Sequence, residues 1–237
     1  SKIGADIIFA FDQITSPLDD YEYNKKAMER THRWARICLT QNAKLKTQNQ
    51  KPKQLLFGIV QGGRFKSLRA KSAKFIGSLP FDGFGIGGSF GRDEMVQTLK
   101  IVVPRLPEEK PRHLLGIGRI QDVFNAVENG IDLFDCVIPT REARHGRIYA
   151  GYGHYDITRG RDSEMPLAKR CKCPACAHGK ITQAKLYKLF KQTDKATAFR
   201  WATIHNIWFF NNLMKNIRAS ITRGSLGTLK KKFFSQT

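Results

Sequence analysis

The sequence predicts a mixed α/β fold: about the last five βα units of a (β/α)₈ barrel, followed by a smaller cysteine-bearing subdomain. Three observations support this prediction. Short apolar runs alternate with amphipathic stretches through the first 137 residues. A polar residue or glycine follows the end of each apolar run. Beyond Thr140 the alternation stops, and three cysteines fall within six positions.

The apolar runs are expected to be buried strands, and the stretches between them helices of a parallel sheet. The expected strands are Asp6–Phe11, Leu55–Val60, Gly83–Ile86, His113–Gly116 and Leu133–Val137. The expected helices are about Tyr23–Gln48, Phe65–Leu79, Arg92–Val103 and Ile120–Asn129. Because the carboxyl ends of parallel strands carry the active sites of such folds, the polar residues after the strands become the candidate site.

Five units do not close a barrel, which needs eight strands and about 250 residues. The remaining alternatives are an open sheet or a barrel that lacks its first part. The expected strand that begins at residue 6 favours a barrel that lacks its first part.

The rest of the chain is expected to form a separate subdomain, which divides the protein into residues 1–148 and 149–237. A basic segment at 141–147 precedes a small hairpin at 149–155 and the cysteine cluster. Helices are expected at about 182–190 and from 195 or 205 to 222. The basic tail, Lys230 to Phe234, is expected to be mobile.

The charge of the chain points to a polyanionic partner. The formal net charge is +21, and residues 138–237 alone hold 20 basic and 5 acidic residues, a net charge of +15. Nucleic acid is the commonest partner for such an excess. The basic residues do not line one amphipathic helix, which argues against a membrane surface. No transmembrane run or signal-peptide pattern occurs in the sequence, so a cytoplasmic location is expected.

The cysteine cluster predicts a structural zinc site. Cys171, Cys173 and Cys176 form a C-x-C-x₂-C pattern whose three thiolates can converge on one ion. A tetrahedral site needs a fourth ligand, for which His178 and His205 are the nearby choices. His178 lies only two positions after Cys176, which makes low-strain closure awkward, whereas His205 lies near the start of an apolar helix.

Two carboxylates follow predicted strands, Asp12 and Asp135. A carboxylate in an apolar setting is costly without a partner or a function, although both residues could also be helix N-caps. A pair of carboxylates at one end of a sheet suits glycosyl-type chemistry. Gln61 and the glycines at 62–63 and 85–88 could approach a flat, purine-like base.

Taken together, these segments resemble the queuine tRNA-ribosyltransferases, also called tRNA-guanine transglycosylases. The resemblance runs along nearly the whole chain. It rests on these segments: 9–12 (FAFD), 57–63 (FGIVQGG), 85–88 (GIGG), 116–118 (GIG), 134–141 (FDCVIPTR), the three cysteines, and 203–207 (TIHNI).

The resemblance implies a (β/α)₈ barrel with a zinc subdomain, and exchange of the tRNA wobble guanine for a 7-deazaguanine base. It implies Asp135 as the nucleophile that forms a covalent ribosyl intermediate, and His205 as the fourth zinc ligand. Further implications are tRNA as partner and a homodimer as the common assembly. The base would be bound by Asp12, Gln61, Gly88 and Leu115, and the RNA by Arg141, Arg144 and Arg147.

The sequence also departs from the family. Its N-terminal strands are absent here, together with a second catalytic Asp and a base-stacking aromatic residue. Gln13-Ile14 replaces the bacterial Glu-Cys, Ser89 replaces a Leu, and Leu115 replaces a pocket Met. One rival interpretation is a non-catalytic, zinc-dependent tRNA-binding protein or subunit. Another, a small-molecule α/β enzyme with an incidental zinc ribbon, leaves the charge of residues 138–237 unexplained.

Overall fold

A computed structural model describes residues 4–48, 54–87, 94–160, 163–178 and 180–234. The chain forms two compact units, Ser1–Cys136 and Val137–Thr237, and each is described by itself. The predicted division into a barrel part, residues 1–148, and a zinc-binding subdomain, residues 149–237, stays a prediction. None of the helices within the described ranges has the length and apolar character needed to span a membrane.

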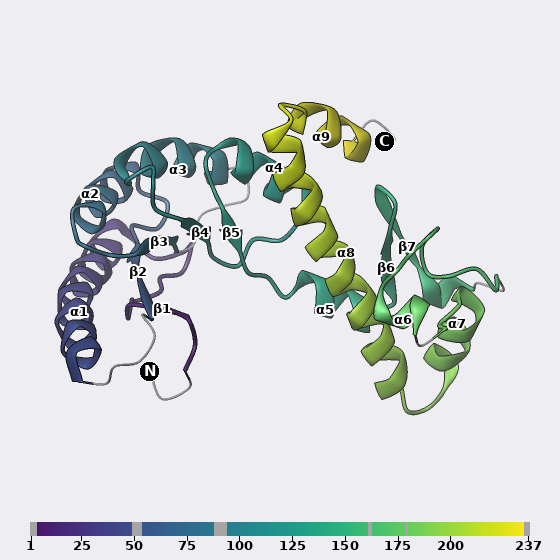
Figure 1. Ribbon diagram of the computed structural model, residues 1–237. Coiled ribbons are helices and arrows are strands. Elements are labelled where there is room, and N and C mark those ends of the chain that lie inside the picture. Colours follow the sequence, from purple (N-terminus) through teal and green to yellow (C-terminus); the bar gives the residue numbers. More distant parts are fainter. Residues whose placement is uncertain (1–3, 49–53, 88–93, 161–162, 179, 235–237) are drawn as a thin grey trace. The chain divides into compact units, whose positions relative to one another are not determined.

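The first unit is a five-stranded parallel sheet with helices between successive strands, as the sequence predicted (Figure 1). Its elements are β1 (Ile7–Phe9), α1 (Tyr21–Gln48), β2 (Leu55–Val60), α2 (Lys66–Gly77), β3 (Gly83–Ile86), α3 (Met95–Val102), β4 (Arg112–Leu114), α4 (Ile120–Glu128) and β5 (Leu133–Phe134). A short 3₁₀ turn, Val103–Arg105, extends α3.

The strand order is β1-β2-β3-β4-β5, so each strand pairs with its predecessor in the sequence. Parallel crossovers are right-handed, and a sheet wound in one direction therefore places all its helices on one face. A (β/α)₈ barrel is built in this way, and the predicted partial barrel is confirmed. A doubly wound sheet would instead reverse its order and carry helices on both faces.

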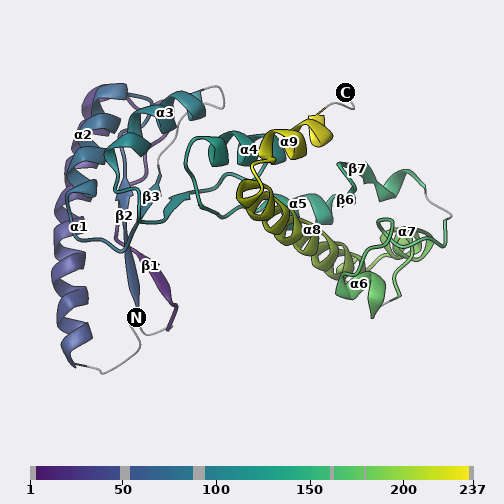
Figure 2. The same cartoon turned by 45° about the horizontal axis from the view of Figure 1, so that its top comes forward.

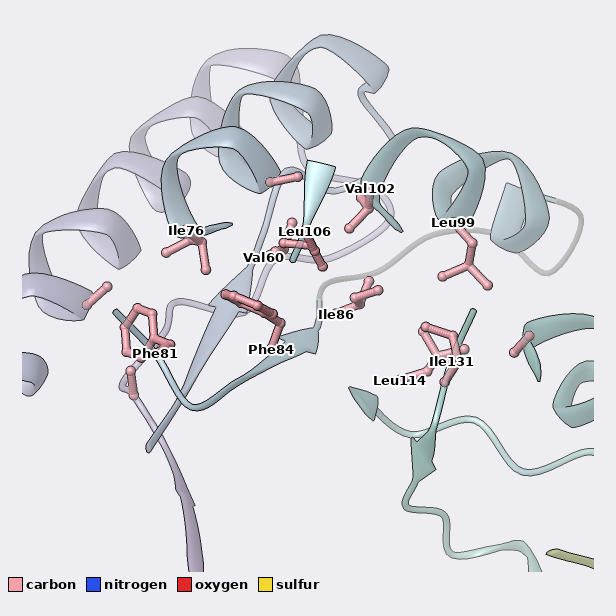
Figure 3. Packing of buried hydrophobic residues seen from close by; sticks show 14 of the residues in the cluster. Val60, Ile76, Phe81, Phe84, Ile86, Leu99, Val102, Leu106, Leu114 and Ile131 are labelled. Carbon is pink, nitrogen blue, oxygen red and sulfur yellow. The ribbon is translucent and has the colours of Figure 1, made fainter. Parts of the chain in front are cut away.

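The main core lies between this sheet and its helices (Figure 3). Alternate residues of a strand point to opposite faces, so Phe84, Ile86 and Leu114 meet the apolar sides of the helices. Ile76, Leu99 and Val102 fill the helical side of the same core, and all of these side chains are fully buried. The other face of the sheet carries Phe9, Phe57 and His113, as described below.

The second unit is built around one long helix, α8 (Ala196–Thr222), against which α5, α6, α7, β6 and α9 pack (Figure 2). The other elements of this unit are α5 (Ile138–Arg144), β6 (Arg147–Ala150), β7 (Gly153–Asp156), α6 (Pro174–Ala177), α7 (Gln183–Lys191) and α9 (Leu226–Phe234), with a 3₁₀ turn at Ile157–Arg159. The expected hairpin is present as the antiparallel pair β6–β7.

Two features of this unit go beyond or differ from the sequence prediction. The first four residues of the basic segment 141–147, for which no secondary structure was predicted, lie in the helix α5, whose buried Ala143 joins the core of the unit. The tail expected to be mobile forms α9 instead, and its Phe233 ring contacts Tyr152 edge-on at 5.0 Å. Tertiary contacts to α8 and to the hairpin stabilise a segment whose sequence shows no strong helical pattern.

Burial of His32 makes the stability of the first unit sensitive to pH. The ring stacks on Phe75 at 4.1 Å, and its Nε2 lies 3.1 Å from Ser72 Oγ. Burial, assisted by the nearby Lys71 and Arg36 charges, lowers the pKa of His32 from 6.5 to about 4. The neutral ring is therefore retained in the folded state while the unfolded chain takes up a proton.

We expect stability to fall as the pH drops from about 6.5 to about 4, and the His32→Gln variant to lose that part of the pH dependence. Thermal melts at pH 7, 6 and 5 measure it. His178→Gln, which changes an exposed histidine, serves as the control. An unchanged pH slope in His32→Gln would contradict the expectation.

Candidate active site and metal centre

Asp135 lies just beyond β5, and two donors from the neighbouring strand end hold it. His113 Nε2 lies 2.8 Å from Asp135 Oδ1, and the Gly116 N–H donates to the same oxygen at 3.0 Å. The strand register explains why these donors reach Asp135. His113 of β4 pairs with Leu133 of β5, so Asp135, two residues after Leu133, lies beside the end of β4. Gly116 adopts φ +75°, a left-handed conformation that glycine reaches without strain.

Both of these hydrogen bonds end on Oδ1, so they orient the carboxylate without covering Oδ2. The Asp135 side chain is 59% exposed. Partial burial raises the pKa of its carboxyl, but the hydrogen bonds from His113 and from Gly116 outweigh burial and hold the pKa below its usual value. The group is therefore an anchored, ionised and accessible carboxylate, which is the form a nucleophile requires.

His113 is the functional candidate that the sequence interpretation did not identify. Its ring packs edge-on against Phe9 at 5.3 Å, and Phe9 packs in the same way on Phe57 at 5.6 Å. These contacts fix the imidazole on the face of the sheet that the helices do not cover. The only sequence signal was a histidine inside a predicted strand, three residues before Gly116.

Asp12 and Gln61 meet at the same end of the sheet. Gln61 Nε2 donates to Asp12 Oδ2 at 2.5 Å, which links the ends of β1 and β2. Burial raises the pKa of the Asp12 carboxyl, and the bond from Gln61 opposes that shift. Gln61 Oε1 is buried and has no hydrogen-bond partner among the described residues. A buried polar atom of this kind is typical of a site where a ligand or water supplies the partner.

Leu115 completes this cluster. A Cβ atom placed on Gly87 would lie 3.3 Å from both Leu115 Cδ1 and Gln61 Nε2, so the backbone of Gly87 runs between them. Of the four residues predicted to bind a base, three gather here. The fourth, Gly88, lies outside the described residues.

In the second unit, Cys171, Cys173, Cys176 and His205 form a cluster that could hold a metal ion. His205 Nδ1 lies 3.7, 3.4 and 3.9 Å from the three sulfur atoms in that order. Tetrahedral zinc, with Zn–S of about 2.3 Å and Zn–N of about 2.0–2.1 Å, requires S···N separations of roughly 3.6 Å. The four side chains therefore have the chemistry and spacing of a structural zinc site.

The surroundings of the cluster prepare its ligands. The other ring nitrogen of His205, Nε2, lies 2.8 Å from the Tyr149 carbonyl oxygen, which places the proton there and leaves Nδ1 free to bind an ion. Hydrogen bonds among the three sulfur atoms lower the pKa of the Cys173 thiol and raise that of the Cys176 thiol, so they favour the thiolate at Cys173. His178, the other candidate, is exposed and is absent from the cluster.

Asn206 fixes the chain around this centre. Its Oδ1 accepts from the Tyr149 N–H at 3.2 Å, while its Nδ2 donates to the Pro139 and Arg147 carbonyls at 3.1 and 2.9 Å. One fully buried amide thus ties α5 and β6 to α8. A long helix that carries His205 is thereby held against the loop of cysteines.

The three arginines expected to bind RNA differ in their surroundings. Arg141 and Arg144 are exposed on the short helix α5. Arg147, at the start of β6, pairs with Glu142 at 2.5 Å. Within the described ranges, Arg141 and Arg144 therefore show no ion pair, whereas the charge of Arg147 is already neutralised in part by Glu142.

Comparison with known proteins agrees with this arrangement. The family model for queuine tRNA-ribosyltransferase matches residues 1–237. The chain belongs to the queuine tRNA-ribosyltransferase family. It is 45% identical over 246 residues to a relative from Archaeoglobus fulgidus, a match that covers 98% of this chain and 58% of that protein.

Two further family members are named queuine tRNA-ribosyltransferase. The one from Symbiobacterium thermophilum is 39% identical, with 100% of this chain and 58% of the relative covered. The one from Acetivibrio thermocellus is 41% identical, with 100% and 62% covered. The chain thus spans about three fifths of the length of these relatives.

Proposed function

We propose that this chain acts in tRNA-guanine transglycosylation, exchanging the wobble guanine of a tRNA for a 7-deazaguanine base. The observation that carries the proposal is the anchored carboxylate of Asp135. In a member of this family, an ionised side chain held by two donors on one oxygen at the carboxyl end of the sheet suits attack on a sugar carbon.

In the proposed reaction, a lone pair of Asp135 Oδ2 forms a bond to the ribose C1′ while the C1′–N9 bond breaks and its electrons pass to guanine. The incoming base then attacks C1′ through its own N9, and the ester bond to Asp135 breaks. The proton that the incoming base loses balances the one that guanine gains. The pair of bonds on Oδ1 stabilises the carboxylate each time it is released.

The base would lie against the cluster at the ends of β1 to β4. The buried Oε1 of Gln61 can accept from an N–H group on a purine-like edge. Asp12 holds the Gln61 amide in place and offers a second acceptor. Leu115 and the glycine backbone at 85–87 would form an apolar surface for the ring, and Gly88, which lies outside the described residues, is proposed as a further base-binding residue from the family resemblance alone.

The tRNA would be held chiefly by the second unit, whose basic excess suits phosphate binding. Arg141, Arg144 and Arg147 follow the proposed nucleophile, Asp135, by 6, 9 and 12 positions in the sequence. A zinc ion bound by the three cysteines and His205 would have a structural role, because four protein ligands leave no open position for a substrate.

The test is release of labelled guanine from tRNA in the presence of a 7-deazaguanine base. Because the chain spans about three fifths of its relatives, it is assayed alone and as a chimera completed with the unmatched residues of the Archaeoglobus fulgidus protein. Exchange by the chimera supports the proposal. Tight tRNA binding by both proteins, with exchange by neither, would favour a non-catalytic tRNA-binding role instead.

His113 gives a narrower prediction. In His113→Phe the packing on Phe9 is kept but the hydrogen bond to Asp135 is lost, so exchange should slow about tenfold or more, the value of one charge-assisted hydrogen bond. His113→Gln can still donate and should recover most of the rate. Single-turnover exchange measures both variants. A His113→Phe protein as fast as the parent would exclude a role for this bond.

A further inference from the structure

A groove of about 570 Å³ lies in the second unit, next to the cysteine cluster. The turn between β6 and β7, the segment 168–172, one face of α8 and part of α9 form its walls. Cys171 and His205 line it as well, so the proposed zinc ligands join two of these walls. None of its lining residues belongs to the unit that carries Asp135.

The charge of the groove is positive. Lys169, Arg170, Lys172 and Lys215 line it, and all four are exposed. No Asp or Glu occurs among its lining residues, all of which lie in the described part of the chain. Arg170 adopts φ +57°, an uncommon conformation for a side-chain-bearing residue that is enriched at functional sites. Four uncompensated cations around one hollow favour an anionic ligand.

The aromatic and amide groups of the groove narrow the class of that anion. Trp208, Asn212 and Asn216 follow one another at intervals of four residues, so they form one stripe along α8 that faces the groove. Trp208 is 38% exposed and Tyr152 44% exposed. A stacking surface beside two amides is the chemistry that binds a nucleobase, whereas a simple polyanion needs only the cations.

We propose that this groove binds one unpaired nucleotide of the RNA substrate, with its base stacked on Trp208. The amides of Asn212 and Asn216 meet the edge of the base, and the four cations meet the flanking phosphates. The inference rests on the proposed function only for the identity of the substrate as RNA. It adds a nucleotide site separate from the reacting guanine.

Binding of two labelled RNAs of equal length tests the proposal: a hairpin with an unpaired loop, and a blunt duplex. Fluorescence anisotropy gives the Kd of each for the zinc-loaded 237-residue chain. Trp208→Ala should weaken hairpin binding about fivefold or more, the loss expected for one stacked base, and leave duplex binding unchanged. Trp208→Phe should retain most of the hairpin affinity.

Ile207→Ala is the matched control, because Ile207 is an exposed neighbour on the same helix that does not line the groove. It should leave both affinities unchanged. Lys169→Gln and Lys172→Gln should each weaken both RNAs and reduce the salt dependence of log Kd by about 0.7–0.9. Circular-dichroism melts identify any variant that fails to fold. If Trp208→Ala is such a variant, the hairpin and duplex affinities of Trp208→Phe are compared with those of the parent instead.

Equal losses for hairpin and duplex in Trp208→Ala, or no loss for either, would overturn the proposal. So would displacement of the hairpin by polyglutamate with equal ease from the parent and from Trp208→Ala, because the site would then bind any polyanion. The assay needs no base exchange. If the chimera shows no base exchange but hairpin binding depends on Trp208, the proposed reaction is refuted and the nucleotide site is supported. If base exchange occurs but hairpin binding does not depend on Trp208, the nucleotide site alone is refuted.

Discussion

Replacing Cys173 with alanine is expected to abolish metal binding and to unfold Val137–Thr237. The Cys173 side chain is fully buried, and the three cysteines belong to the core of the unit. Structural zinc contributes an apparent free energy of about 10–16 kcal/mol in zinc-finger peptides. A domain has only about 5–15 kcal/mol of net stability, so loss of the ion should exceed what this unit can tolerate.

Metal content by mass spectrometry and hydrogen exchange along the chain measure this effect. The parent should hold one zinc ion per chain, and Cys173→Ala none. Fast exchange should spread through residues 137–234 of the variant, with protection retained in the first unit. A chelator should reproduce the variant's pattern in the parent protein.

Two matched pairs make the zinc prediction specific. His205→Ala should lose the ion while His178→Ala keeps it, since His205 Nδ1 faces the sulfur atoms. Cys173→Ala should lose it while Cys38→Ala keeps it, because Cys38 packs against the core of the first unit. A zinc ion retained in His205→Ala, or a parent protein folded equally well without metal, would contradict the proposed site.

Asp135→Asn should reduce base exchange by on the order of a thousandfold or more. The amide has almost the same shape as the carboxylate but carries no negative charge and is a poor nucleophile. Removal of one catalytic group in other covalent enzymes causes losses of about this size or larger. Affinity for tRNA should remain near that of the parent, since the residues proposed to bind the phosphates, Arg141, Arg144 and Arg147, are unchanged in this variant.

Labelled guanine release gives the rate, and a denaturing gel of the protein incubated with tRNA reveals the covalent ribosyl intermediate. The parent should form that complex, and Asp135→Asn should not. Asp6→Asn is the control. Asp6 is an exposed carboxylate that precedes β1, so it lies at the amino end of the parallel strands, whereas Asp135 follows the carboxyl end of β5. Undiminished exchange by Asp135→Asn would remove Asp135 from the proposed nucleophilic role.

The order of helices and strands could be predicted from the sequence because it depends on local patterns. The apolar runs at 55–60 and 83–86 became β2 and β3 with the bounds expected. Shorter strands were less predictable: β5 contains only Leu133 and Phe134. Its length depends on pairing with β4, which a local apolar run does not reveal.

The elements α5 and α9 also required tertiary information. The segment 138–144 is polar and basic, and it is helical because its apolar positions pack against α8. The tail at 226–234 contains glycine and a run of lysines, a composition that predicts mobility. Contacts far apart in the sequence, such as Tyr152 with Phe233, outweigh that local preference.

By itself, the sequence determined the βα order, the basic second half and the three cysteines, because these features depend on composition and on spacing within one short segment. The tertiary structure decided which residues meet. His205, 34 positions after Cys171, lies in the cluster where the nearer His178 does not. His113, 22 positions before Asp135, anchors it. A parallel sheet and a long helix bring side chains that are far apart in the sequence within hydrogen-bonding distance. The number of residues between two side chains does not predict their distance in space.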